Sequence, residues 1–156
     1  MIVISHRGNL EGVNPEKENS LSYIAHAIHK GYEVEIDLRS KGGKLFLGHD
    51  TPDHPVTPEW LEIYRNYLWI HVKDFESLKW LTSQEVEFKY FCHESDKYCL
   101  TSNGYIWSHD LENEMTDHCI VPLLDADSVD TFSQDGFYAV CTDFAYKCDR
   151  KFNFKL

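Results

Sequence analysis

The sequence predicts an α/β fold: a compact parallel (β/α)8 barrel in which several helices are shortened or missing. Two observations lead to this prediction. Eight short apolar runs are typical of strands, and helical segments separate several of them. A closed ring of such units leaves no unprotected sheet edge. Because barrels of this kind typically need about 200 residues or more and the chain has 156, an open twisted sheet is the main alternative.

The strands are expected at residues 2–5, 33–38, 45–49, 67–73, 87–92, 105–108, 119–124 and 137–142, and helices at 20–30, from 57 or 58 to 66, and at 74–81. The first helix has apolar residues at helical spacing, a cap at Asn19 or Ser20 and a stop at Gly31. The six residues between the second and third strands are too few for a crossover helix. This connection is therefore either a hairpin that turns at Gly42-Gly43 or an extended segment.

Composition excludes several classes of protein. A net charge of −11 argues against nucleic acid or an anionic membrane surface as the main partner. No apolar stretch approaches the roughly 20 residues of a bilayer helix, so membrane insertion is not expected. The five cysteines form no CxxC pair and the apolar opening is short for a secretion signal, which favours a reducing, cytoplasmic setting. The length predicts one domain over residues 1–156 and leaves the oligomeric state open.

Polar clusters follow three of the predicted strands. They are Ser5-His6-Arg7-Gly8, Glu35-Ile36-Asp37 and Gly48-His49-Asp50. Side chains two apart in a strand point the same way, so Glu35 and Asp37 can share a cation. The ordinary pKa of histidine suits general acid and base catalysis near neutral pH. Either histidine alone would be read as a solvated loop residue, but beside Glu35-x-Asp37 the pair predicts a catalytic site.

Further motifs extend this pattern in a fixed order. In chain order they are His6-Arg7-Gly8, Glu18-Asn19-Ser20, Gly31, Glu35-x-Asp37, Gly43 and His49-Asp50. They resemble the amino-terminal signature of the glycerophosphodiester phosphodiesterase family, which reads His-Arg-Gly, Glu-Asn-Thr, Glu-x-Asp, Asp-Gly, His-Asp. Ser20 keeps the hydroxyl of the threonine, and Gly42-Gly43 keeps the turn of Asp-Gly. The match covers roughly the first third of the chain and implies a TIM barrel with its site at the carboxyl ends of the strands.

The resemblance also implies roles for individual residues. His6 and His49 would be the general acid and base, without indicating which is which. Arg7 would clamp a phosphate, because its guanidinium fork matches two phosphate oxygens. Lys73 occupies the position of the family's phosphate-binding lysine. Glu18 would be a supporting acid near the metal or His6.

The fourth predicted strand departs from the family pattern. Where the family has a third metal-binding glutamate, this chain has His71, two residues before Lys73. His71 is either a metal ligand or a core histidine. The resemblance implies a divalent metal, Mg, Mn or Ca, held by Glu35 and Asp37. If His71 also binds, manganese or zinc gains over calcium, which takes oxygen ligands almost exclusively.

Other polar residues are assigned more generally. Glu33 lies nearer the start of its strand than Glu35 and is expected to form a structural ion pair. Five further residues near predicted strand ends could line the pocket: His93, Trp107, His109, Asp125 and Asp143.

The leading hypothesis is a metal-dependent phosphodiester hydrolase of lipid metabolism. It would act on a small glycerophosphodiester-type substrate by two-histidine acid and base catalysis. One alternative is a catalytically weak or inactive phosphate-binding module on the same fold, because the third carboxylate is missing. A second is a phospholipid hydrolase acting at membranes, which the acidic composition disfavours.

Overall fold

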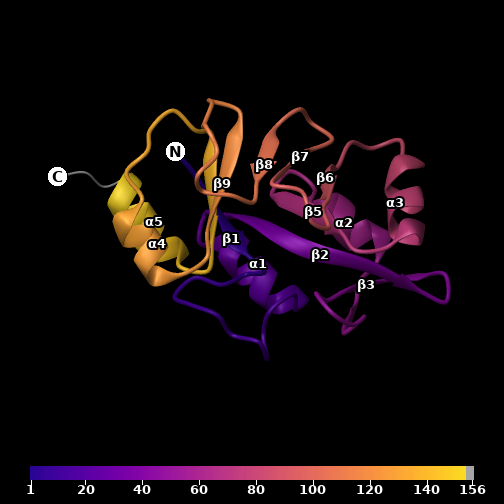
Figure 1. Ribbon diagram of the computed structural model, residues 1–156. Helices are drawn as coiled ribbons and strands as arrows, with labels where there is room; N and C mark the ends of the chain where they lie inside the picture. The colour runs from indigo at the N-terminus through magenta and orange to yellow at the C-terminus, as the bar shows by residue number, and fades with distance from the viewer. Residues whose placement is uncertain (154–156) are drawn as a thin grey trace.

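The computed structural model of the protein describes residues 1–153, in which seven parallel strands curl into a half-barrel (Figure 1). In spatial order the parallel strands are β6 (Lys89–Cys92), β5 (Leu68–Val72), β2 (Glu33–Lys41), β1 (Ile2–His6), β10 (Ala139–Thr142), β9 (Cys119–Leu123) and β8 (Ile106–Ser108). β1 therefore lies at the centre of the sheet, between β2 and β10. This order brings residue 1 close to residue 153, and the Met1 amino group donates a hydrogen bond to Asn153 Oδ1.

Three further strands are antiparallel. They are β3 (Lys44–Leu47), β4 (His54–Pro55) and β7 (Tyr98–Leu100), which pair with β2, β3 and β8 respectively. β2 and β3 form a hairpin, with Leu38 opposite Leu47. Gly42 and Gly43 turn it at φ values of 58° and 74°, which favour glycine. The predicted hairpin connection is confirmed, and the extended alternative is wrong.

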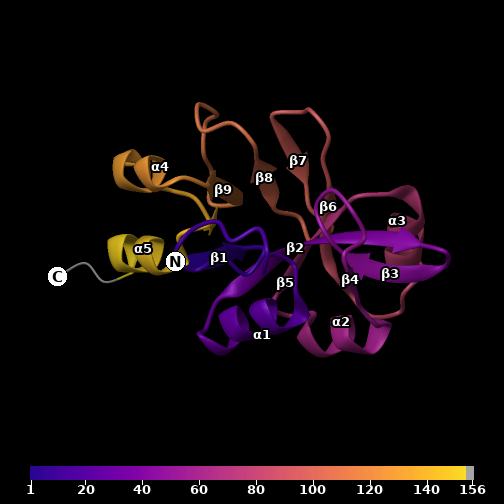
Figure 2. The same ribbon diagram turned by 90° about the horizontal axis from the view of Figure 1, so that it is seen from below.

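Within residues 1–153, five helices cover the outer side of the curled sheet, which Figure 2 shows from below. They are α1 (Leu21–His29), α2 (Pro58–Tyr64), α3 (Phe75–Thr82), α4 (Ala126–Thr131) and α5 (Ala145–Phe152). The first three lie close to the predicted ranges. Thr57 and Asp74 begin α2 and α3 by accepting hydrogen bonds from backbone N–H groups of the first turn. None of the helices within residues 1–153 is long and apolar enough to cross a membrane.

The expected closed (β/α)8 TIM barrel is wrong. β6 and β8 do not pair with each other in the described part of the chain, and no helix stands between them there. Part of the chain between β6 and β8 forms β7 and the turn of the β7–β8 hairpin, and too few residues remain for a crossover helix. Hydrogen bonds across the gap come from Ser102, whose N–H donates to Tyr90 O and whose Oγ accepts from Tyr90 N, and the rings of Phe91 and Trp107 stack across it. The third expected barrel strand is lost as well, because residues 44–47 run antiparallel to β2.

Strand parity divides the core into two layers. On β2, Val34, Ile36 and Leu38 belong to the larger cluster, which lies with the helices on the outer side. Glu33, Glu35 and Asp37 alternate with them and therefore face the inside of the curl. A second, largely aromatic cluster fills that inside: Ile4, Trp69, Phe91, Trp107, Ile120, Ala139 and Cys141. The carboxylates of Glu33, Glu35 and Asp37 therefore share the inside of the curl with this second apolar cluster.

Candidate functional site

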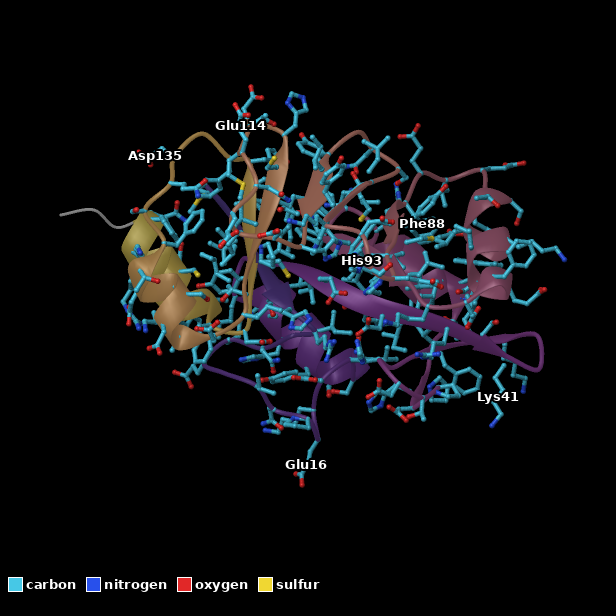
Figure 3. All side chains as sticks on the ribbon, in the orientation of Figure 1. Glu16, Lys41, Phe88, His93, Glu114 and Asp135 are labelled. Atoms are coloured by element: carbon cyan, nitrogen blue, oxygen red, sulfur yellow. The ribbon has the colours of Figure 1, made fainter. Side chains whose placement is uncertain are left out.

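A cavity of about 130 Å³ opens where the parallel strands end. It is lined by His6, Arg7, Glu35, His49, His71, Phe91, His93, Trp107, His109, Pro122, Leu124 and Cys141. Figure 3 labels His93, which follows β6 and appears near the centre of the view, whereas Lys41 marks the far end of the β2–β3 hairpin. Larger grooves of about 900, 640, 390 and 230 Å³ are lined by different residues. The predicted chemical groups gather in the smaller cavity.

Glu35, Asp37 and His71 form the one cluster among residues 1–153 that could hold a metal ion, with one ligand atom from each lying within 4.8 Å of the others. β2 and β5 place them side by side, because Asp37 is in register with His71. His71 Nδ1 lies 3.3 Å from Asp37 Oδ1 and 3.7 Å from Glu35 Oε1. All three side chains are largely withdrawn from solvent. Two carboxylates and one imidazole are the donor set that the sequence predicted.

Each member of this cluster has a buried polar atom without a hydrogen-bond partner among the described residues. These atoms are Glu35 Oε2, Asp37 Oδ1 and His71 Nε2. Buried polar groups are normally paired, since an unpaired one costs about 1–3 kcal/mol. A bound cation would satisfy such atoms together, so the residues fit a divalent metal.

The two carboxylates differ in their electrostatic surroundings. Burial, reinforced by the negative charge of Asp37, raises the pKa of Glu35 to about 7. Burial also acts to raise the pKa of Asp37, but the neighbouring His71 and the Arg7 guanidinium outweigh it and hold this pKa below its ordinary value. Asp37 is therefore the permanent anion of the pair. Glu35 takes up a proton readily unless a cation replaces it.

Two strained residues deliver side chains to Asp37. Arg7 and Asn19 have φ values of 56° and 60°, a region that few residues other than glycine adopt. Asn19 N donates to Arg7 O, which joins the two turns. Asn19 Nδ2 donates to Asp37 Oδ2 at 2.9 Å, and Arg7 Nε lies 3.0 Å from the same oxygen. The expected cap role of Asn19 is therefore wrong: Ser20 is the cap position, and Asn19 orients the carboxylate.

His6 lies at the end of β1 and contacts a carboxylate from the far end of the chain. Its Nδ1 is 2.8 Å from Oδ1 of Asp143, which follows β10. The same Oδ1 accepts a hydrogen bond of 2.7 Å from Asn9 Nδ2. Although burial acts to lower the pKa of His6, the hydrogen bond to Asp143 and the charge of Glu35 outweigh it and raise this pKa. His6 Nε2, 3.7 Å from Glu35 Oε2, faces the cavity.

His49 reaches the same cavity from residues 48–53, which we call the His49 loop. Gly48 N donates to Asp37 O at 3.0 Å. Arg39, on β2, donates to the carbonyl oxygens of Gly48 and His49. Gly48 is required here, because a Cβ at this position would lie 1.9 Å from Thr51 O. The His49 side chain is 41% exposed, and its partner Asp50, 2.8 Å away, is 89% exposed.

The other predicted site residues lie at the edge of this arrangement. Lys73 Nζ is 3.9 Å from Asp37 Oδ1, and Lys73 is not among the residues that line the cavity. Glu18 accepts hydrogen bonds from Arg7 and Asn9, as expected of a supporting acid. Glu33 pairs with Lys89 at 2.6 Å, so the expected structural ion pair is confirmed.

The sequence analysis did not identify three positioning residues. Asn9 and Arg39 were not expected at the site, and Asp143 was expected there without a specific role. Asp143 was expected only as one of several polar residues near strand ends. Its position one residue beyond β10, next to β1 in the sheet, was the available signal. Asn9 and Arg39 gave no signal, since their partners are set by the turns after β1 and β2.

Comparison of the chain with protein-family models, with curated proteins and with solved structures gives no match.

Proposed function

We propose that the protein is a metal-dependent phosphodiester hydrolase that acts on a small glycerophosphodiester-type substrate. The observation that carries the proposal is the gathering of His6, Arg7, Glu35, His49 and His71 around one cavity. Such a set supplies a metal site, a cation for phosphate and two proton carriers. The sequence motifs that resemble the glycerophosphodiester phosphodiesterase family supply His6, Arg7, Glu35 and His49, whereas His71 departs from the family pattern.

The binding groups suit a phosphodiester. Glu35, Asp37 and His71 would hold a divalent metal, which supplies Lewis-acid stabilisation of the phosphoryl oxygens when bound. Arg7 adds a positive charge from the other side, and burial in the cavity strengthens its attraction for an anion. The guanidinium is oriented beforehand by Asp37 and Glu18. Phosphate recognition would then cost little reorganisation.

The two histidines suit proton transfer. One would take a proton from the attacking hydroxyl, which belongs to water or to the substrate, and the other would give one to the leaving alcohol oxygen. The products are an alcohol and a phosphomonoester, either directly or through a cyclic phosphodiester. The small cavity favours a short alcohol over a lipid with acyl chains.

The test is release of product from glycerophosphocholine with magnesium, manganese, calcium or zinc, and after chelation. We expect metal-dependent hydrolysis that is lost in Asp37→Asn, since the permanent anion of the cluster is removed. Lys44→Gln, on β3 and outside the cavity, is the matched control and should retain activity. Absence of hydrolysis together with binding of glycerol phosphate by calorimetry would support the phosphate-binding module instead.

The expected setting and partners stay predictions alongside this function. A cytoplasmic enzyme acting on small diesters accords with the free cysteines among residues 1–153 and with the negative net charge.

A further inference from the structure

We infer that Asp143 is a positioning residue that fixes the ring tautomer of His6 and thereby makes His6 the general base. This inference rests on the proposed function and assigns the two histidine roles that the motifs leave open. It depends on the contacts of one carboxylate oxygen, the burial of its surroundings and the contrast with the other histidine.

The first step is the direction of the hydrogen bonds at Asp143. Its Oδ1 accepts from Asn9 Nδ2 at 2.7 Å, and an amide NH₂ can only donate. The remaining contact of that oxygen is His6 Nδ1, 2.8 Å away. An ionised carboxylate has no proton to give, so Nδ1 carries the proton and donates it. The neutral imidazole then has its lone pair on Nε2.

The second step is where Nε2 points. It faces the cavity and lies 3.7 Å from Glu35 Oε2, too far for a hydrogen bond. The lone pair is therefore available to a hydroxyl group bound in the cavity. In the other tautomer Nε2 would carry the proton, and Nδ1 would present a lone pair to a carboxylate, which repels it.

The third step is that Asp143 is itself held and shielded. Asp143 is 3% exposed, and its carboxylate belongs to a chain of hydrogen bonds that continues through Asn9 to Glu18 and Arg7. We call these residues, with His6, the His6 network. Because the carboxylate is buried, it stabilises the imidazolium that forms when Nε2 accepts a proton. The network also links the base to the group that would bind phosphate.

The reaction follows with its protons accounted for. His6 Nε2 takes the proton of the attacking hydroxyl as the new P–O bond forms. His49 gives its proton to the alcohol oxygen as the old P–O bond breaks. His49 is left for this role, and its side chain is 41% exposed, so that solvent reaches it. When a substrate hydroxyl attacks, water then opens the cyclic diester: His49 takes a proton from this water as the new P–O bond forms, and His6 returns its proton to the hydroxyl oxygen as the ring P–O bond breaks. When water attacks directly, His6 releases its proton to solvent and His49 takes one from solvent, which restores both histidines.

The variant that tests the inference is Asp143→Leu, which keeps roughly the size of the side chain and removes the oxygen that His6 Nδ1 and Asn9 Nδ2 both contact. The matched control is Asp117→Leu: Asp117 contacts His118 Nδ1 at the same 2.8 Å, but the pair is on the surface, with side chains 87% and 62% exposed. Nitrogen-15 NMR of the histidine rings, assigned with His6→Gln, reports the tautomer. Hydrolysis of glycerophosphocholine with manganese gives kcat and KM separately.

We expect wild-type His6 to be in the Nδ1–H form and Asp143→Leu, which offers Nδ1–H no acceptor, to shift it toward the Nε2–H form. The kcat of this variant should fall by roughly 10²–10⁴-fold, the usual contribution of a general base, with KM changed less than about threefold. Asp117→Leu should change neither. His6 in the Nε2–H form in the wild type, or full kcat in Asp143→Leu, would overturn the inference. If no diester is hydrolysed, the proposed function fails, and the NMR measurement alone decides the tautomer.

Discussion

The two histidines of the cavity are held in opposite ways. His6 sits at the end of a central strand, with buried partners that come from β10 and from the turn after β1. His49 sits on a loop, and its only side-chain partner within residues 1–153 is the neighbouring, solvent-exposed Asp50. Both pairs have the same 2.8 Å contact. The difference shows that contact length does not measure how firmly a side chain is held, because burial and independent supports decide this.

Removing each histidine separates their structural roles and should have the largest effect on activity. His6→Ala and His49→Ala should each lower kcat by roughly 10²–10⁴-fold. His6→Ala also leaves Asp143 with one buried partner fewer, which should lower the free energy of unfolding by about 1–3 kcal/mol. His49→Ala should change it by less than about 0.5 kcal/mol. Urea unfolding and steady-state kinetics measure both; equal losses of stability would contradict the contrast.

Displacing the His49 loop should have the next largest effect. In Gly48→Ala the new Cβ would lie 1.9 Å from Thr51 O, so the loop must move and carry His49 with it. A shift of about 1 Å can cost roughly 10²-fold in rate, and we expect a fall in kcat of that order. Gly43→Ala is the control, because its φ is also positive, at 74°, but no atom crowds its Cβ. It should lose about 1 kcal/mol of stability and keep kcat.

The next effect concerns the three residues that could hold a metal ion. Glu35, Asp37 and His71 should prefer manganese or zinc to calcium, and His71→Glu should move the order toward magnesium and calcium by about tenfold. Metal binding should also weaken as pH falls through about 7, because Glu35 then takes up a proton. Calorimetry with each metal at two pH values measures this. An unchanged order of metals would show that His71 does not bind.

The smallest effect concerns the end of β2 that supports the His49 loop. Asp74 accepts hydrogen bonds from Ser40 N and from Ser77 N, so it joins β2 to the start of α3. Burial acts to raise the pKa of Asp74, but these hydrogen bonds outweigh it and lower the pKa. Asp74→Ala should lower the free energy of unfolding by about 1–2 kcal/mol at pH 7.

The pH dependence of this loss follows from the direction of the shift. A lowered pKa in the folded state means that Asp74 stabilises the protein above its unfolded pKa of about 3.9. The contribution disappears as pH falls through the lower, folded value. The difference between wild type and Asp74→Ala should therefore shrink in acid, as thermal unfolding at several pH values can show. Asp125→Ala, which removes the cap of α4 far from β2, should leave kcat unchanged where Asp74→Ala reduces it slightly.

Some features of the protein were predictable because they depend on near neighbours in the chain. Alternation along β2 set Glu35 and Asp37 on one face, and the glycine pair at 42–43 made the hairpin that returns His49 to them. Helix caps and periodicity gave α1 to α3. Each of these follows from backbone geometry over a few residues.

Other features were decided only by the tertiary structure. Whether the sheet closes depends on the pairing of β6 with β8, and the intervening chain formed the β7–β8 hairpin instead. Asp143 meets His6 across 137 residues, through the register of β1 against β10. Asn19 was one of two cap positions expected from the sequence, but its side chain donates a hydrogen bond to Asp37 on β2. Strand neighbours and their register are set by the packing of the whole chain, so residue patterns within single segments do not specify them.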